Sequence, residues 1–199
     1  MRILELGKFY PPHHGGMETL LQSLSEGLAR RGAEIDCVVA NDFPRTERLA
    51  DANLRVHRLA SFGTLFSVSL CPAYVGATRR IGANLWHAHF PNPLADVACL
   101  RGDPRVPLVI SYHSDVIRQR RLVRFYEPLF RRMLARATRI VVATPRHIDC
   151  SPWLPAWREK CEVIPYGIRL DRFRSTEAIA RHAAELKEQA GGLPVLLNV

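Results

Sequence analysis

Histidines, glycines and small polar side chains gather directly after several apolar runs of this chain. They form four groups: His13, His14, Gly15 and Gly16; His89 and Asn92; His113, Ser114 and Asp115; and Tyr166 and Gly167. Each group follows a run that is typical of a buried strand. Because ligands of open α/β sheets bind beyond the carboxyl ends of the strands, we expect the four groups to line one site.

The first group lies in FYPPHHGGMETLLQSL (9–24), between an apolar run and an amphipathic helix. Glycine lets the backbone approach a ligand closely, and the start of the next helix offers free N–H groups and partial positive charge. Gly15 and Gly16 are therefore candidates for binding a phosphate or a sugar oxygen. The alternative is a plain glycine turn with Glu18 in the first helical turn. The fingerprint G-x-G-x-x-G is absent, which argues against NAD.

His87 and His89 flank Ala88 in WHAHF (86–90). Alternation along a strand places both histidines on one face, where they could ligate a metal ion. No cysteine or carboxylate pair nearby in the sequence completes a set of ligands, so we expect no metal. For His87, a structural polar contact at the strand end is the favoured interpretation.

SYHSD (111–115) places His113 and Asp115 just past another buried strand. A Ser–His–Asp hydrolase could use such residues, but the nucleophile-elbow pattern G-x-S-x-G is absent. A histidine at a strand end can also be a simple loop anchor. Because His113 lies on the same edge as the glycine loop, a functional role and a role as a loop anchor are about equally favoured.

The elements that must position these groups alternate between strand and helix. Strands are expected at 2–6, 34–40, 55–60, 85–90, 107–113, 139–144, 161–167 and 193–199. Helices are expected at 16–31, 64–83 with a break near Pro72, 93–100, 116–137 and 175–190, and 41–53 is the most loop-like stretch. The pattern predicts an α/β fold, Rossmann-like and doubly wound, with a mainly parallel sheet.

Composition indicates a soluble globular protein with an anionic partner. Of 199 residues, 47% are hydrophobic and 24% charged, and the formal net charge is +9, carried mostly by arginine. The five cysteines are odd in number and lack metal-type spacing, which favours free thiols in a reducing compartment. No signal peptide and no apolar run of membrane-spanning length is visible. The expected location is cytoplasmic, with peripheral contact at the inner face of the plasma membrane left open.

The stretch 117–139 contains eight arginines and one glutamate beside an apolar stripe, and Pro128 should kink or divide the helix. Such a helix could lie on an anionic membrane. The alternative, slightly favoured, is a core-packed helix with a solvated basic face. Nucleic acid is not expected as a partner, because no recognised binding motif is present.

Five blocks resemble the retaining glycosyltransferases of sequence family four, which have the GT-B fold. They are YPPHHGGMETLLQSLSEGLARRG (10–32), LWHAHFPNPL (85–94), ISYHSD (110–115), RIVVATP (139–145) and VIPYGIRLDRF (163–173). The resemblance covers essentially the whole chain. The stretch 110–173 looks most like bacterial mannosyl- and related transferases that assemble exopolysaccharide or O-antigen on lipid carriers.

The resemblance implies a GDP- or UDP-linked sugar as donor, bound without a metal ion or other cofactor between two Rossmann-like domains. Gly15 and Gly16 would lie against the donor's diphosphate or sugar. His113 would lie beside the transferred sugar and help to stabilise an oxocarbenium-like transition state. The remaining members of the four groups would lie on the acceptor side or in the cleft. Tyr166 stands where the family more often has asparagine, so no specific contact is expected of it.

The resemblance also divides the chain. Residues 1–173 would form the N-terminal, acceptor-side domain. Residues 174–199 would contain an interdomain helix and the first strand of a truncated nucleotide-sugar domain. We therefore expect these 199 residues alone to transfer sugar very weakly or not at all.

The sequence thus predicts a hexosyltransferase of the mannosyl type, acting on a glycan or polyprenyl-linked acceptor in cell-surface polysaccharide biosynthesis. One alternative is a single-domain module that binds sugar or phosphate, with its last strand paired into the sheet. The other is a hydrolase that uses His113 and Asp115.

Overall fold

The computed structural model describes residues 1–115, 120–167, 170, 174–191 and 193, except for the side chains of 120–125. The chain divides into two compact units, Met1–Pro165 and Tyr166–Val199, and each is described by itself. The first unit contains the sheet and the helices that cover it. The second contains α6 (Glu177–Gln189), which matches the helix expected at 175–190 and begins at Thr176, whose side chain accepts a hydrogen bond from the Ile179 N–H.

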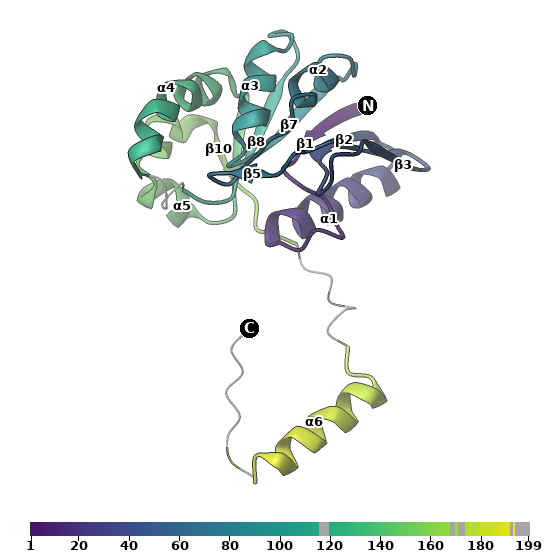
Figure 1. Cartoon of the computed structure of the whole chain (residues 1–199). Helices are drawn as coiled ribbons and strands as arrows, with labels where there is room; N and C mark the ends of the chain where they lie inside the picture. The colour runs from purple at the N-terminus through teal and green to yellow at the C-terminus, as the bar shows by residue number, and fades with distance from the viewer. Residues whose placement is uncertain (116–119, 168–169, 171–173, 192, 194–199) are drawn as a thin grey trace. The chain divides into compact units, whose positions relative to one another are not determined.

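An eight-stranded sheet forms the centre of the first unit (Figure 1). Its strands are β1 (Arg2–Leu6), β2 (Glu34–Ala40), β3 (Glu47–Asp51), β4 (Leu54–Leu59), β7 (Leu85–Phe90), β8 (Leu108–Tyr112), β9 (Arg139–Val142) and β10 (Cys161–Val163). The spatial order is β10-β9-β8-β7-β1-β2-β4-β3, and every pairing is parallel except that of β3 with β4. The expected Rossmann-like, mainly parallel fold is confirmed.

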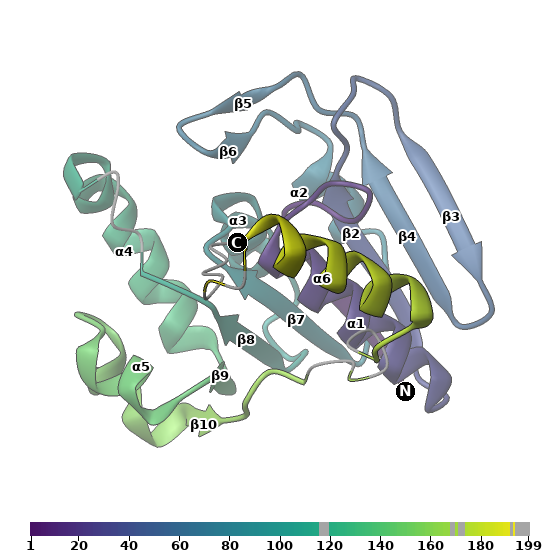
Figure 2. The same ribbon diagram turned by 90° about the horizontal axis from the view of Figure 1, so that it is seen from below.

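Helices cover both faces of this sheet. Figures 1 and 2 show α1 (Gly16–Arg30) on one face, and α2 (Tyr74–Thr78), α3 (Pro93–Arg101) and α4 (Arg120–Arg136) on the other. The short helix α5 (Pro145–Cys150) and the 3-10 helix η1 (Leu154–Lys160) follow β9. This layering is the doubly wound arrangement that alternating strands and helices favour.

The two faces of the sheet contain cores of different size. A large apolar cluster joins the strands to α2, α3 and α4, and includes Phe90, Tyr112 and Phe130. The cluster under α1 is smaller and contains Leu21 of the helix with Cys37 and Val39 of β2. On the α1 side, therefore, apolar packing is concentrated at β2 and β4, and β7 and β8 present polar side chains there.

Two expectations about local structure are wrong. The stretch 41–53, expected as a loop, contains the edge strand β3, which lacks an apolar pattern because most of its side chains are exposed. The stretch 64–83, expected as a helix, begins with a hairpin of β5 (Thr64–Leu65) and β6 (Val68–Ser69), and only α2 is α-helical. Phe66 and Ser67 both have positive φ, as a type I′ hairpin turn requires.

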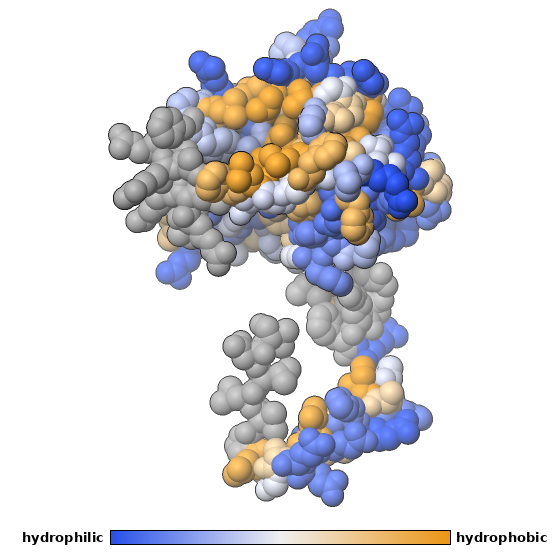
Figure 3. Space-filling view, in the orientation of Figure 1, coloured by the Kyte–Doolittle hydropathy of each residue, from blue (hydrophilic) through white to orange (hydrophobic). Residues whose placement is uncertain are grey.

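That hairpin leaves large apolar side chains in solvent. The exposed residues are Phe62, Leu65, Phe66 and Leu70. Figure 3 shows apolar side chains gathered across the face of the first unit where Figure 1 labels β5. The apolar composition of 64–83 favours a helix, but in the folded chain the apolar side chains of the hairpin lie on the surface.

Other elements differ in extent from their sequence-based prediction, and some expected residues lie outside the described part of the chain. The strand expected at 161–167 ends at Val163. Helix α4 is undivided, with Pro128 inside it, and 116–119 of the expected basic helix lie outside the described residues. The strand expected at 193–199 also lies outside them, apart from Leu193, which is irregular.

The cysteines are all free, as expected: Cys37, Cys71 and Cys99 are buried, Cys161 is half-buried and Cys150 is exposed. Within the described part of the chain, no helix is both long enough and apolar enough to cross a bilayer.

Candidate functional site

Three of the four predicted groups lie at or just beyond the carboxyl ends of strands that are neighbours at the centre of the sheet, and His89 is the penultimate residue of its strand, β7. β1 pairs with β7, and β7 pairs with β8. The strand order reverses between β1 and β7, and this is the switch point at which doubly wound sheets bind ligands. This order places the first three groups next to one another along the carboxyl edge of the sheet, as the sequence predicts.

A hydrogen-bonded network of buried and half-buried polar side chains lies on the α1 side of these strands. We call it the histidine network; its members are Glu5, His87, His89, Ser111 and His113. In the sheet register Glu5 lies opposite His87, and His89 lies opposite Ser111, so alternation turns all of them to one face.

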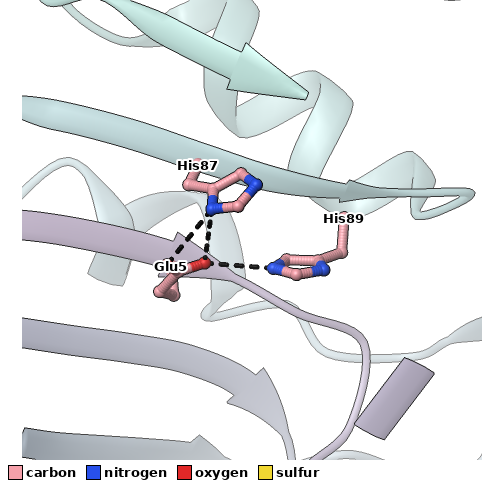
Figure 4. A group of neighbouring side chains, drawn as sticks. All are labelled: Glu5, His87 and His89. Atoms are coloured by element: carbon pink, nitrogen blue, oxygen red, sulfur yellow. Dashed lines mark hydrogen bonds and ion pairs between the residues drawn. The ribbon is translucent and has the colours of Figure 1, made fainter. Parts of the chain in front are cut away.

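Glu5 is fully buried and contacts both histidines of β7 (Figure 4). Its Oε1 is 3.2 Å from Nδ1 of His87, and its Oε2 is 3.0 Å from Nε2 of His89. The outer nitrogens of the two rings continue the network. Nε2 of His87 is 2.8 Å from Oγ of Ser111, and Nδ1 of His89 is 3.0 Å from Nε2 of His113.

Burial and hydrogen bonding act in opposite directions on these groups. Burial alone raises the pKa of Glu5, but the nearby His87 and His89 outweigh it and lower that pKa to about 2. Burial lowers the pKa of His89, although Glu5 opposes the shift. The pKa of His113 falls to about 3, because of burial and then of its histidine neighbours. At neutral pH, Glu5 is therefore ionised, and His89 and His113 are neutral.

Glu5, His87 and His89 are also residues of the types that hold metal ions, and one ligand atom from each lies within 4.8 Å of the others. Glu5 is 82 residues from His87 in the chain, so the sequence gives no sign that this carboxylate lies beside the two histidines. A carboxylate that accepts two imidazole N–H groups is a complete arrangement without an ion.

The glycine loop after β1 presents two different environments. A Cβ on Gly15 would lie 2.0 Å from Oε2 of Glu18, whereas a Cβ on Gly16 would meet no heavy atom within 4 Å. Glu18 is itself buried against the start of α1. Both glycines are exposed, and Gly16 is the position where a side chain would project into open space.

Lys8 is a half-buried cation directly after β1, which the sequence reasoning did not single out. Burial lowers the pKa of its ammonium group, and the carboxylate of Glu18 acts in the opposite direction. A half-buried cation next to a helix start strengthens the case for an anionic ligand at this loop.

His13 and His14 differ although they are adjacent. The His13 ring stacks on Phe9, with 4.0 Å between centroids, and its Nδ1 is 2.7 Å from Oδ1 of Asp42. His14 is exposed. His13 therefore shapes the loop, and His14 is the more accessible of the two.

Asn92 is bonded within the fold. Its side chain accepts a hydrogen bond from Ala95 N–H at the start of α3 and donates to the carbonyl of Gly7, at 2.9 Å. Tyr74 donates to the same carbonyl at 2.7 Å. These bonds tie the exit of β1 to the opposite helical layer, which positions the glycine loop.

Asp115 also has local partners. Its Oδ1 accepts hydrogen bonds from the hydroxyls of Tyr112 and Ser151. Glu5 is the carboxylate that reaches His113, through His89. The arrangement gives the hydrolase interpretation no support, and Ser114 is exposed.

Tyr166 and Gly167 belong to the second unit, so their expected place in the site stays a prediction. Burial raises the pKa of the Tyr166 phenol.

The apolar stripe of α4 packs inward over its described half. Phe130, Met133 and Leu134 are buried, and Phe130 stacks on Phe90 with 4.0 Å between ring centroids. Arg131 and Arg132 are exposed. This part of α4 is the core-packed helix with a basic outer face that the sequence slightly favoured.

Similarity to known proteins agrees with this architecture. Residues 15–167 match the family described as glycosyl transferase 4-like domain. O-antigen chain mannosyltransferase C of Escherichia coli is 33% identical over 174 residues, 84% of this chain and 46% of that protein. D-rhamnosyltransferase WbpZ of Pseudomonas aeruginosa is 33% identical over 180 residues, 87% of this chain and 46% of that protein. The chain spans about half the length of these curated relatives.

Solved structures share the fold. Sucrose-phosphate synthase of Thermosynechococcus elongatus superposes with a TM-score of 0.69 at 18% identity, over 97% of this chain and 53% of that one. HepE of Anabaena, in complex with UDP and glucose, gives a TM-score of 0.55 at 18% identity, over 96% and 50%. At such identities the likeness concerns the fold, and membership rests on the sequence matches: the chain belongs to the glycosyl transferase 4-like domain family.

Proposed function

We propose that the protein containing this chain is a retaining glycosyltransferase. It moves a hexosyl residue of the mannosyl type from a GDP- or UDP-linked sugar to a glycan or polyprenyl-linked acceptor, in cell-surface polysaccharide assembly. The observation that carries the proposal is the family match over residues 15–167, together with relatives named as an O-antigen mannosyltransferase and a rhamnosyltransferase.

The geometry at the switch point supports this activity. The start of α1 offers Gly16 with open space beside it, and the half-buried Lys8 follows β1. In the proposed reaction the donor's diphosphate or sugar lies against this loop. A neutral His113 lies at the neighbouring strand end, where its imidazole bonds a hydroxyl of the transferred sugar as positive charge develops at the anomeric carbon.

The proposed reaction uses no metal ion or other cofactor. Hydrogen bonds account for the arrangement of Glu5, His87 and His89, and the helix start and Lys8 supply positive charge for an anionic donor. By resemblance to the family, a second domain holds most of the nucleotide.

The direct test is an assay of the full-length natural protein with GDP-mannose, GDP-rhamnose, UDP-glucose and UDP-galactose, using a polyprenyl-diphosphate-linked glycan as acceptor. Product is identified by mass spectrometry, and its anomeric configuration by NMR. We expect transfer from one donor with retention. Failure of the folded protein to use any sugar nucleotide would contradict the proposal.

His113→Ala probes the site in the same assay. We expect kcat to fall about 100-fold, the order of loss found when one group that stabilises developing charge is removed. His182→Ala is the matched control, because His182 is an exposed histidine of α6. Equal activity of the two variants would remove His113 from the site.

We also propose that α4 brings the protein to an anionic membrane surface, where a polyprenyl-linked acceptor would lie. The support is the exposed pair Arg131 and Arg132 on a chain of formal net charge +9. Co-sedimentation with phosphatidylglycerol vesicles should weaken on changing both residues to glutamate. The same change at the exposed pair Arg79 and Arg80 should have less effect. Equal binding to uncharged phosphatidylcholine vesicles would exclude this contact.

A further inference from the structure

Three members of the histidine network form a linear chain from the interior of the sheet to its carboxyl edge. Oε2 of Glu5 contacts Nε2 of His89 at 3.0 Å, and Nδ1 of the same ring contacts Nε2 of His113 at 3.0 Å. Glu5 and His89 are 0% and 2% exposed. Nothing in the roles expected of His113 requires such a buried carboxylate two side chains away.

Counting protons along the chain fixes which atoms donate. An ionised carboxylate only accepts hydrogen bonds, so Nε2 of His89 must carry a proton. A neutral imidazole has one N–H, so Nδ1 of His89 is an acceptor. The 3.0 Å contact with His113 then requires Nε2 of His113 to donate.

We propose that Glu5 is a positioning residue that acts through His89 to hold the proton of His113 on Nε2, leaving Nδ1 unprotonated. This follows the general rule that a buried carboxylate hydrogen-bonded to an imidazole selects its tautomer. The low pKa of Glu5 and the lowered pKa of His89 agree with the protonation states that the count needs.

The tautomer limits what His113 can recognise. Any group that hydrogen-bonds to Nδ1 must donate, as a sugar hydroxyl can and a fully ionised phosphate cannot. Within the proposed function, on which this step rests, Glu5 makes His113 an acceptor for a hydroxyl of the transferred sugar.

Two other arrangements predict the opposite tautomer. If a metal ion replaced the bond between Glu5 and His89, Nδ1 of His89 would carry the proton and donate to His113. A doubly protonated His89 would donate to His113 in the same way. In both cases Nε2 of His113 would accept, and its single proton would be on Nδ1.

The test is ¹⁵N NMR of the histidine rings in the whole 199-residue chain at neutral pH, with the His113 signals assigned by loss in His113→Gln. We expect a protonated-type shift at Nε2 and an unprotonated-type shift at Nδ1. The reverse pattern in the untreated protein would overturn the proposal. Zinc or manganese copurifying with the chain at one equivalent would also overturn it.

Two variants separate Glu5 from the rest of the network. In Glu5→Gln the amide can donate to His89 as well as accept, so the preference of His113 for the Nε2–H form should be lost. Ser111→Ala is the control: it breaks the bond at Nε2 of His87 and leaves the Glu5–His89–His113 chain intact, so the tautomer should be kept. Should Glu5→Gln fail to fold, His89→Gln interrupts the same chain. An unchanged tautomer in the folded variant would overturn the proposal.

Kinetics of the full-length protein test the consequence for transfer. Glu5→Gln should lower kcat about 10- to 100-fold, the range seen when an outer partner that orients a functional histidine is removed. Glu34→Gln is the matched control, because Glu34 lies at the start of β2 and pairs with Arg2. An altered tautomer with unchanged kcat would overturn the catalytic part. A full-length protein without transferase activity would contradict the proposed function, while the NMR result would still decide the tautomer.

Discussion

Towards their carboxyl ends, β7 and β8 carry chemically opposite side chains on their two faces. The α1 side presents Leu85 and Val109 and then His87, His89 and Ser111, followed by His113; the other face presents Trp86, Ala88, Phe90, Leu108, Ile110 and Tyr112. The polar face is joined by directed hydrogen bonds to one buried carboxylate, Glu5. The apolar face is joined by ring stacking to α4, with Phe130 as its centre.

The difference shows where stability and function are located in these strands. Apolar contacts are non-directional, so the apolar face can stabilise the sheet without fixing the position of any proton. The polar face must desolvate Glu5 and His89, and this opposes folding unless every hydrogen bond is made. We expect substitutions on the apolar face to lower the free energy of unfolding. Substitutions on the polar face should change activity and the pH dependence of stability.

The largest effect on stability is expected for Phe130→Ala. Phe130 is 1% exposed and contacts the rings of Phe90 and Trp153. Truncation leaves a cavity, so the free energy of unfolding in urea should fall by about 3–5 kcal/mol. Phe43→Ala is the matched control at 64% exposure, with an expected change below about 0.5 kcal/mol. Similar losses for both variants would contradict this picture of the core.

A second effect should appear as acid sensitivity of the polar face. The folded pKa of His113 is about 3, below its ordinary value of 6.5, so the unfolded chain binds more protons between these values. Stability from this group is present above about pH 6.5 and declines as pH falls towards 3. Urea unfolding should lose about 2 kcal/mol between about pH 6.5 and pH 5 on account of His113.

His113→Gln removes this titration and should make the profile less steep over that range, with the contribution of His89 remaining. Glu5 begins to contribute only at lower pH, because its pKa falls from 4.5 to about 2 on folding. A variant with the same slope as the wild type would show that His113 titrates normally in the fold.

A buried carboxyl group on the apolar side, Asp96 of α3, should respond to pH in the opposite direction. Its carboxyl oxygens are buried without a hydrogen-bond partner among the described residues, and burial raises its pKa well above 3.8. The folded chain therefore binds the extra proton, and stability falls as pH rises above the unfolded value. Asp96→Asn should become progressively more stable than the wild type as pH rises above about 4, measured by urea unfolding. An advantage that shrinks as pH rises would contradict the sign.

The smallest effect on stability should distinguish the two glycines of the loop. Gly15→Ala forces Glu18 to move, because the new Cβ would lie 2.0 Å from its Oε2, and should cost about 1 kcal/mol. Gly16→Ala has open space at the first position of α1 and should change stability by less than about 0.5 kcal/mol. Thermal unfolding of both variants measures the difference; a larger loss for Gly16→Ala would reverse the assignment of the open position.

Much of the fold was predictable from local patterns. The apolar runs at 2–6, 34–40 and 85–90 are strands with the expected bounds. The spacing at 16–31 predicted α1 to within one residue. Period-two and period-3.6 patterns are local properties of the chain, so sequence alone reveals them. The hairpin at 64–69 and the edge strand β3 were missed, because exposed pairing leaves no apolar periodicity.

The candidate site was predictable in outline only. His89, His113 and the glycine loop were selected because each follows a strand, and the strand order brings these three groups together. Glu5 and Ser111 were not selected, since a single polar residue within an apolar run gives no signal of its partner. Asp115 was expected beside His113 in a functional role, but its described hydrogen bonds go to Tyr112 and Ser151.

By itself, the sequence determined the alternation of β7 and β8, and with it the common face of His87 and His89. It also determined the glycines at the start of α1 and the family to which the chain belongs. Only the tertiary structure decided that β1 lies beside β7 and brings Glu5 to both histidines across 82 and 84 residues. The reason is physical: alternation depends on neighbouring residues, whereas the partner of a buried charge depends on which distant strands pair.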